Sequence, residues 1–407
     1  MEEWKEYKLI DVLDALIDYR GKTPKKVEKG IPLITAKIVK NGRINAPNEF
    51  LAEEDYDNWM GRGFPNAGDV VLTTEAPLGE VAQLDERKVA LAQRIVTLRG
   101  KKNVLDNTYL KYYLLSNIGQ SRLKARETGT TVTGIKQSEL REVLVTCPPF
   151  ETQQKIANIL SSLDDKIEVN RRINEQLEEL AQALFKSWFV DFEPFKDGEF
   201  VESELGMIPE GWKVCELKDF GQIICGKTPS KDNKDFYGGN IPFIKIPDIH
   251  NNIFVWNTTD WLSNKGDASQ VNKRIPPYSI CVSCIATVGL VAINTTFAHT
   301  NQQINTIIPN NAFERYYLFE QLKSMKEYIQ NLGRGGTATL NVNTRLFGSI
   351  KVLRPSEKVL KEYDGVINGF FKKIELNQQE ITHLTNLRDT LLPKLMSGEI
   401  DVNDVEI

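Results

Sequence analysis

A pattern of apolar residues between Phe150 and Trp188 constrains this chain more than any other feature of its sequence. The apolar positions, together with Asn170 and Asn174, alternate in steps of three and four residues. This alternation is typical of a coiled-coil seam, because a surface helix of a globular domain carries a broader apolar stripe. Roughly 33 such residues form a helix about 50 Å long. A lone apolar seam stays exposed to water, so the pattern predicts a partner helix.

The same seam recurs 207 residues later, and Asn170 falls on Asn377 under this shift. The first seam consists of Ile156, Leu160, Leu163, Ile167, Asn170, Leu177 and Leu184, and the second of Tyr363, Ile367, Phe370, Ile374, Asn377, Leu384 and Leu391. Equivalent helices that pack on each other are related by a two-fold axis, which predicts an antiparallel coiled coil with pseudo-two-fold symmetry. Because a polar seam position fixes register, we expect Asn170 and Asn377 to face one another or a shared water.

The repeat extends into the sequence before each helix. Gly21-Lys22-Thr23-Pro24 is echoed by Gly226-Lys227-Thr228-Pro229, and the offset drifts between 204 and 210 before it settles at 207. Short β-rich runs bounded by Gly and Pro alternate with single helices expected at 107–126 and 312–332. Each half is therefore predicted to be a mixed α/β domain followed by a long helix, which makes the fold class α+β.

The linker boundaries follow from composition, since Pro194, Gly198, Gly206, Pro209 and Gly211 cluster between the halves. The predicted segments are a first domain at 1–149, a first coiled-coil helix at 150–190, a linker at 191–211, a second domain at 212–355, a second coiled-coil helix at 356–398 and a C-terminal tail at 399–407.

Composition favours an ordinary globular protein in a reducing cytoplasm. The 407 residues are 41% hydrophobic and 26% charged, and the five cysteines do not suggest a disulfide framework. No long apolar run predicts a membrane span, and the first residues lack the pattern of a secretory signal. The net charge is −4, but the acid is concentrated in the helical stretches: 151–195 has 5 basic against 9 acidic residues, and 356–407 has 6 against 10. The two predicted domains are each slightly basic.

The junctions of these segments carry the resemblance to a known family. The first helix ends Trp188-Phe189-Val190-Asp191-Phe192-Glu193-Pro194, and the chain closes with Leu391-Leu392-Pro393-Lys394-Leu395, followed by Ser397-Gly398-Glu399-Ile400. This chain resembles, over its whole length, the DNA-specificity subunit of type I restriction–modification systems.

The resemblance implies two target-recognition domains that each read one half of a bipartite site in double-stranded DNA. It also implies that the helices bind methyltransferase subunits, two per chain, and that restriction subunits join through the complex. The specificity subunit of that family has no catalytic centre, so no cofactor, no metal and no membrane contact are expected.

Two alternatives come from other classes of protein. Gly221-x-x-x-x-Gly226-Lys227-Thr228 matches the phosphate-loop pattern, which would make the chain a coiled-coil nucleotide hydrolase. Its intervening residues Gln-Ile-Ile-Cys are bulky and β-prone, so a Gly-Lys turn beside a strand is the better interpretation. The other alternative is a scaffold whose domains bind protein.

Two further motifs have structural interpretations. Cys147-Pro148-Pro149-Phe150 resembles an amino-methyltransferase motif but lacks the residue that holds the amine, so we expect a strand end before the first long helix. Cys281 and Cys284 are spaced so that their thiols diverge on a strand. They are therefore expected to be core residues rather than zinc ligands with His299.

The candidate DNA contacts are cations, hydroxyls and amides near Gly-rich turns. Lysines and threonines on such turns suit phosphate, and Gln or Arg side chains form bidentate bonds with adenine or guanine edges. The candidates are Lys22, Thr23, Gln93, Arg94, Gly129, Thr130 and Thr131 in the first half, and Lys227, Thr228, Lys245, Gln302, Gln303, Arg334, Gly336 and Thr337 in the second.

Overall fold

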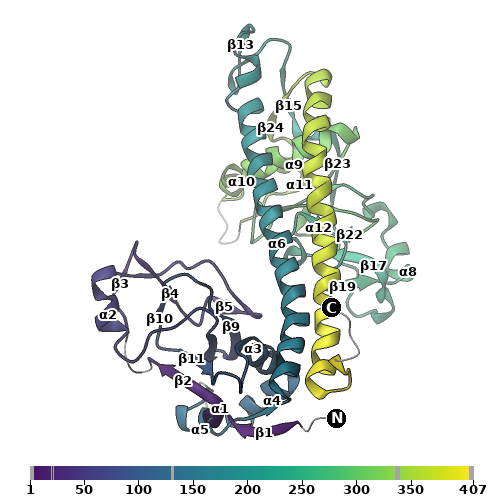
Figure 1. Ribbon diagram of the computed structural model, residues 1–407. Coiled ribbons are helices and arrows are strands. Elements are labelled where there is room, and N and C mark those ends of the chain that lie inside the picture. Colours follow the sequence, from purple (N-terminus) through teal and green to yellow (C-terminus); the bar gives the residue numbers. More distant parts are fainter. Residues whose placement is uncertain (1–3, 20, 22, 130–132, 335–339, 403–407) are drawn as a thin grey trace. The chain divides into compact units, whose positions relative to one another are not determined.

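The computed structural model describes residues 4–19, 21, 23–129, 133–334 and 340–402. The chain divides into two compact units, unit 1 with Met1–Glu168 and Ile381–Ile407, and unit 2 with Val169–Glu380. Both boundaries cut through a long helix, α6 (Phe150–Phe189) or α12 (Glu357–Ser397), so each unit holds part of each helix (Figure 1). The ends of both helices lie within one residue of the predicted bounds.

Unit 1 is built on an antiparallel sheet in the order β2-β11-β8-β9. Its strands are β2 (Leu13–Asp18), β11 (Ile95–Gly100), β8 (Val70–Thr74) and β9 (Leu78–Gln83). Alternate side chains point to opposite faces of a strand. Val70 and Leu72 enter a core shared with helix α3 (Asn107–Leu115) and both long helices, whereas Val71 enters a second core beneath another sheet.

That other sheet of unit 1 has the order β10-β4-β7-β3. Its strands are β10 (Ala90–Leu91), β4 (Ile31–Ile34), β7 (Phe50–Leu51) and β3 (Lys26–Val27). The remaining strands are β1 (Lys5–Lys8), β5 (Val39–Lys40), β6 (Arg43–Ile44) and β12 (Leu144–Cys147). The α-helices before α6 are α1 (Leu9–Val12), α2 (Tyr56–Trp59), α3 (Asn107–Leu115), α4 (Asn117–Lys124) and α5 (Gln137–Arg141).

Unit 2 repeats this plan with the strand order β16-β23-β20-β21-β18. These strands are β16 (Gly221–Cys225), β23 (Ile304–Pro309), β20 (Ile280–Ser283), β21 (Val291–Asn294) and β18 (Phe254–Val255). A second sheet has the order β19 (Asp260–Leu262), β17 (Tyr237–Ile244) and β22 (His299–Thr300). The other strands are β13 (Phe200–Ser203), β14 (Gly206–Pro209), β15 (Lys213–Glu216) and β24 (Lys351–Arg354), and the α-helices are α7 (Ile246–Ile249), α8 (Asn264–Ala268), α9 (Arg315–Ser324), α10 (Lys326–Leu332) and α11 (Thr344–Gly348).

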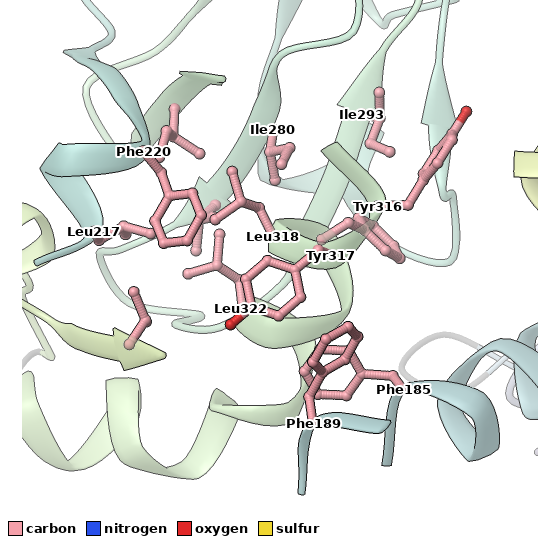
Figure 2. Close-up of a cluster of buried hydrophobic side chains, with 14 of the residues drawn as sticks. Phe185, Phe189, Leu217, Phe220, Ile280, Ile293, Tyr316, Tyr317, Leu318 and Leu322 are labelled. Atoms are coloured by element: carbon pink, nitrogen blue, oxygen red, sulfur yellow. The ribbon is translucent and has the colours of Figure 1, made fainter. Parts of the chain in front are cut away.

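Aromatic side chains join the sheet of unit 2 to the long helices. Phe185 and Phe189 of α6 lie 5.9 and 4.8 Å from the ring of Tyr317 on α9, measured between ring centroids. Figure 2 shows this cluster, with Ile280 and Ile293 of the sheet on the far side of α9. The phenol of Tyr317 donates to the carbonyl of Leu353 at 2.5 Å, so its polar end is satisfied within an apolar core.

The two long helices run antiparallel within each unit, as predicted. In unit 2, Asn174 of α6 pairs with Asn377 of α12. Asn170, one turn earlier in α6, pairs with Glu380, which comes later in α12, as expected for antiparallel helices. In unit 1, Arg388 donates to Asp164. The fourteen predicted seam residues are all buried or half-buried.

The expectation that Asn170 and Asn377 pair directly was wrong, whereas the alternative of a shared water stays a prediction. The repeat makes these residues equivalent, but contact also depends on their distance from the symmetry axis. Each lies about two residues, or half a helical turn, from the axis, so each meets a different residue: Asn170 donates to Glu380 at 2.8 Å and Asn377 donates to Asn174 at 2.8 Å.

The predicted single helices at 107–126 and 312–332 are each divided, into α3 and α4 and into α9 and α10. Ser116 causes the first break, because its extended backbone ends α3 and its hydroxyl accepts from the amide of Gly119 to cap α4. The linker at 191–211 also contains an unpredicted hairpin, β13–β14. In the described part of the chain, no helix is long and apolar enough to span a bilayer.

Candidate nucleic-acid interface

One end of the main sheet gathers the candidate residues in each unit. In unit 1, Val96 pairs with Asp18 and Ile95 with Thr73, so β2 and β8 end where β11 begins. In unit 2, Cys225 pairs with Asn305 and Ser283 with Ile304, which gives the same arrangement. We call these regions the sheet ends. They comprise residues 21, 23, 74–77 and 93–94 in unit 1, and 226–228, 284–287 and 302–303 in unit 2.

A threonine and a glutamine meet at each sheet end. The hydroxyl of Thr23 donates to Oε1 of Gln93 at 3.4 Å, and the hydroxyl of Thr228 donates to Oε1 of Gln302 at 2.5 Å. In each pair the threonine hydroxyl occupies the carbonyl oxygen of the glutamine amide, which leaves the Nε2 group of that glutamine as a hydrogen-bond donor. These donors have no partner among the described residues.

The next residue differs between the units. Arg94 is exposed and forms an ion pair through Nε with Glu75 at 3.0 Å. Its counterpart Gln303 is half-buried, and its Oε1 accepts from Asn301 at 2.9 Å. The backbone is nevertheless matched, because the carbonyls of Arg94 and Gln303 accept from the amides of Thr74 and Cys284, which lie where the neighbouring strand ends and its turn begins. The two sheet ends therefore share a framework and differ in side chains.

Each of those turns holds an alanine in the left-handed region. Ala76 has φ of 50° and Ala286 has φ of 62°. A residue with a Cβ rarely adopts this conformation, and such strained positions concentrate at functional sites. Their occurrence at equivalent positions in two repeats points to a conformation that the sheet ends require.

The described residues that follow the Gly/Thr-rich segments, which begin at Gly129 and Gly333, bond to the same turns. Ile135 donates to the carbonyl of Thr74 at 2.9 Å, and Val342 donates to that of Cys284 at 2.8 Å. Gly129 and Arg334 are exposed at the described edges of these loops. The candidates Lys22, Thr130, Thr131, Gly336 and Thr337 lie outside the described residues.

The phosphate-loop pattern of unit 2 forms a strand and a turn. Residues Gly221 to Cys225 are β16 and pair with β23 along their whole length. A phosphate cradle needs free amides in a loop at a helix N-terminus, whereas these amides belong to a sheet. This arrangement supports the interpretation of Gly226-Lys227 as a turn after a strand.

A buried polar chain lies behind this turn. Nε2 of His299 lies 2.7 Å from Oδ1 of Asp267, and Nδ1 lies 3.2 Å from Nε2 of Gln270. Burial lowers the pKa of His299 and outweighs Asp267, which raises it. Sequence reasoning considered His299 only as a third zinc ligand and missed this chain. The repeat offered one signal for it: the residue of unit 1 that is equivalent to His299 is Ala90, so the histidine is particular to unit 2.

Other candidates take part in local contacts. Lys245 follows β17, and its ammonium forms an ion pair with Asp260, so it is not a free cation.

Cys281 and Cys284 enter different core clusters, which confirms that their thiols diverge. Burial raises the pKa of these thiols to about 12 and about 11. Cys147 ends β12 and Phe150 begins α6, as expected for a strand end before the helix. The described residues contain no group of three His, Cys, Asp or Glu side chains placed to hold a metal.

The fold and its two sheet ends define a class of protein in which two repeated α/β units, each with a polar cluster at one sheet end, are joined by two long helices. The family described as "Type I restriction modification DNA specificity domain" matches residues 1–179 and 209–386. The chain belongs to this family.

Individual relatives agree over nearly the whole chain. It is 39% identical to the Type I restriction enzyme HindI specificity subunit of Haemophilus influenzae, over 98% of this chain and 100% of the relative. It is 29% identical to the MjaIX specificity subunit of Methanocaldococcus jannaschii, over 99% and 95%. The crystal structure of a type I restriction–modification S subunit from M. genitalium matches with a TM-score of 0.64 at 17% identity, covering 97% and 96% of the chains, which supports the fold.

Proposed function

We propose that this chain is the sequence-specific DNA-binding subunit of a type I restriction–modification complex and that each sheet end reads one half of a bipartite target. The observation that carries the proposal is the Thr–Gln pair, which recurs at equivalent places in both units and leaves the Nε2 group of each glutamine without a partner among the described residues. Relatives that match over nearly the whole length are named specificity subunits of type I restriction enzymes.

The chemistry of the sheet ends suits double-stranded DNA. Glutamine amides form hydrogen bonds with base edges in the major groove, and cations with hydroxyls contact phosphates. Lys227, Thr228 and Arg334 provide the second kind of contact in unit 2, and Gln93 and Gln302 provide the first kind. Because Arg94 and Gln303 differ between the units, the two half-sites differ in sequence.

This assignment follows the segments of the chain. Residues 1–149 and 212–355 are the target-recognition domains, 150–190 and 356–398 the helices that bind the methyltransferase, 191–211 the linker and 399–407 the tail. The subunit is cytoplasmic and carries no catalytic centre, so methylation and cleavage belong to its partners. The residues of the phosphate-loop pattern form the paired strand β16, which argues against the nucleotide hydrolase alternative. The glutamine amide donors that recur in both units favour DNA over a protein ligand.

Two methyltransferase subunits bind each chain in this proposal, and restriction subunits join through them. The support is a set of exposed apolar residues that recurs at equivalent positions of the two long helices. Leu180 is 54% exposed and its equivalent Leu387 is 38% exposed, and Val169 and Leu376 form a second equivalent pair at 49% and 48%. In this proposal these residues lie within the surface that each methyltransferase subunit covers, and a set of positions that occurs twice can bind the same partner twice.

The test is to map DNA methylation by the assembled complex for two single variants. Gln93→Ala should relax base preference at positions of one half-site only, and Gln302→Ala at positions of the other only. A lost bidentate contact costs about 1–3 kcal/mol of discrimination. Glu86→Ala changes an exposed residue of unit 1 outside the sheet end and should leave both half-sites unchanged. If either glutamine variant altered both half-sites, or neither altered any, the assignment would be wrong.

A further inference from the structure

The backbone of Lys227 is held on both sides while its side chain is free. Its amide donates to the carbonyl of Thr300 at 2.9 Å, and its carbonyl accepts from Nε2 of Gln270 at 3.0 Å. The preceding Gly226 lies so close that a Cβ there would overlap the carbonyl oxygens of Thr300 and Asn301. The Lys227 ammonium is exposed and has no partner within the described ranges.

The direction of the Gln270 amide is fixed by His299. The Asp267 carboxylate accepts from Arg274 Nε at 2.7 Å and faces His299 Nε2, so Nε2 carries the imidazole proton and Nδ1 accepts. Gln270 must then present Nε2, rather than Oε1, to Nδ1 of His299 and to the carbonyl of Lys227. Its Oε1 is buried without a partner in the described structure. Such an unsatisfied atom destabilises the fold, and a functional requirement would explain why it is present.

Unit 1 lacks the equivalent of His299, so this row of hydrogen-bonded side chains has no counterpart there. β10 pairs with β4 in parallel as β22 pairs with β17, which places Ala90 where unit 2 has His299. We propose that Gln270 and His299 are positioning residues that hold the Lys227-Thr228 turn ready to contact DNA in the second half-site. This inference rests on the proposed function of the sheet end of unit 2.

The physical reason is preorganisation. A lysine contact to phosphate gains affinity when its backbone is already fixed, because less conformational freedom is lost on binding. The Thr228 hydroxyl on the same turn also orients Gln302. Displacement of the turn would therefore weaken a phosphate contact and loosen a base contact in one half-site only.

The experiment uses the full chain assembled with its methyltransferase subunits, and a DNA duplex that carries the target sequence identified by methylation mapping. Gln270→Met keeps the side-chain length and removes both donors. We expect about tenfold weaker binding and a base preference that is relaxed only in the second half-site. The slope of log K against log salt concentration should become shallower by about 1, as for loss of one phosphate contact. Gln153→Met is the matched control, because Gln153 is an equally buried amide of unit 1 that bonds Asp106, Val104 and Pro148, none of which belongs to a sheet end. It should leave the salt slope and both half-sites unchanged.

A double variant separates positioning from a general loss of folding. In a Lys227→Ala background, Gln270→Met should have little further effect on the salt slope, because the contact that it positions is already gone. A full additional effect in that background, or equal weakening at both half-sites, would overturn the positioning role. If Gln302→Ala relaxes the second half-site while Gln270→Met changes nothing, only the positioning role fails. If Gln302→Ala and Lys227→Ala both leave DNA recognition intact, the proposed function of this sheet end fails with it.

Discussion

Asn377 of α12 donates a hydrogen bond from Nδ2 to Oδ1 of Asn174 on α6 at 2.8 Å, and both amides are buried in the seam of unit 2. A polar pair in an apolar seam lowers stability and fixes which residues face each other. One turn away, Asn170 makes an equivalent bond to Glu380. The helix register in unit 2 is therefore specified by two adjacent amide contacts.

Replacing one partner of this pair should cost more than replacing both. Asn377→Leu leaves Oδ1 of Asn174 buried without a donor, and we expect a loss of about 1–3 kcal/mol in unfolding free energy. The double variant Asn174→Leu/Asn377→Leu should recover most of that loss, because two apolar groups pack without an unsatisfied atom. Denaturant unfolding of the three variants measures this coupling. A double variant as unstable as the sum of the single variants would contradict it.

A charged cluster has the corresponding role in unit 1. Asp164 on α6 accepts from Tyr112 at 2.6 Å and from Arg388 at 2.8 Å, and lies 3.1 Å from the Lys111 ammonium. Burial raises the pKa of Asp164, but Lys111 and the hydrogen bonds from Tyr112 and Arg388 outweigh it, so the pKa is lowered.

Asp164→Asn should therefore destabilise unit 1 by about 3 kcal/mol at neutral pH, because it leaves a buried lysine without its counterion. A carboxylate with a lowered native pKa contributes stability above its unfolded pKa and loses it as the pH falls through the native value. The difference between wild type and variant should shrink below about pH 3.8. Urea unfolding across a pH series measures it, and Asp165→Asn, an exposed neighbour, is the control. A difference that is independent of pH would argue against the ionic explanation.

The sequence predicted the features that repeat along one element, and missed those that depend on how elements meet. The seam could be predicted because burial leaves a regular spacing in the sequence. The contact partners of Asn170 and Asn377 could not, since a repeat shows equivalence and not distance from the axis. Thr23 and Gln93 were both chosen as candidates, yet their pairing across 70 residues depends on sheet topology. The role of His299 depends on burial, which a single histidine in a sequence does not reveal.

A buried glutamate makes unit 2 sensitive to pH. Glu320 on α9 is 2% exposed, and its Oε1 is unpaired among the described residues. Burial raises its pKa to about 7; nearby Lys323 lowers the pKa, and Glu178 raises it. The native state therefore keeps this proton between about pH 4.5 and 7 while the unfolded state loses it, so stability decreases as pH rises through that range.

Glu320→Gln should remove this decrease and stabilise the protein above pH 7 by up to about 3 kcal/mol. Thermal unfolding of wild type and variant between pH 4.5 and 8 measures the effect. Glu362→Gln makes the same change at an exposed position of α12 and should leave the pH profile as in wild type. Parallel profiles for wild type and Glu320→Gln would show that Glu320 does not hold the proton.

The last prediction concerns the gap between the half-sites. α6 passes from unit 1 to unit 2 between Glu168 and Val169, and α12 passes back between Glu380 and Ile381. Seven residues inserted at both places keep the 3.5-residue seam in phase and lengthen each helix by about 10 Å, which corresponds to about three base pairs of DNA. If the helices set the spacing, the complex should select targets with a gap longer by about three base pairs and with both half-sites unchanged.

Selection from a duplex pool with varied gaps, followed by methylation mapping, measures the gap and the base preferences together. A four-residue insertion at both places should lengthen the gap by about two base pairs, while it disturbs the seam phase. Insertion in α6 alone is the control: it moves α6 against α12 and separates Asn174 from Asn377, so it should reduce stability rather than produce a new gap. If the paired insertion changed the bases read, or left the gap at its original length, the long helices would not determine the spacing.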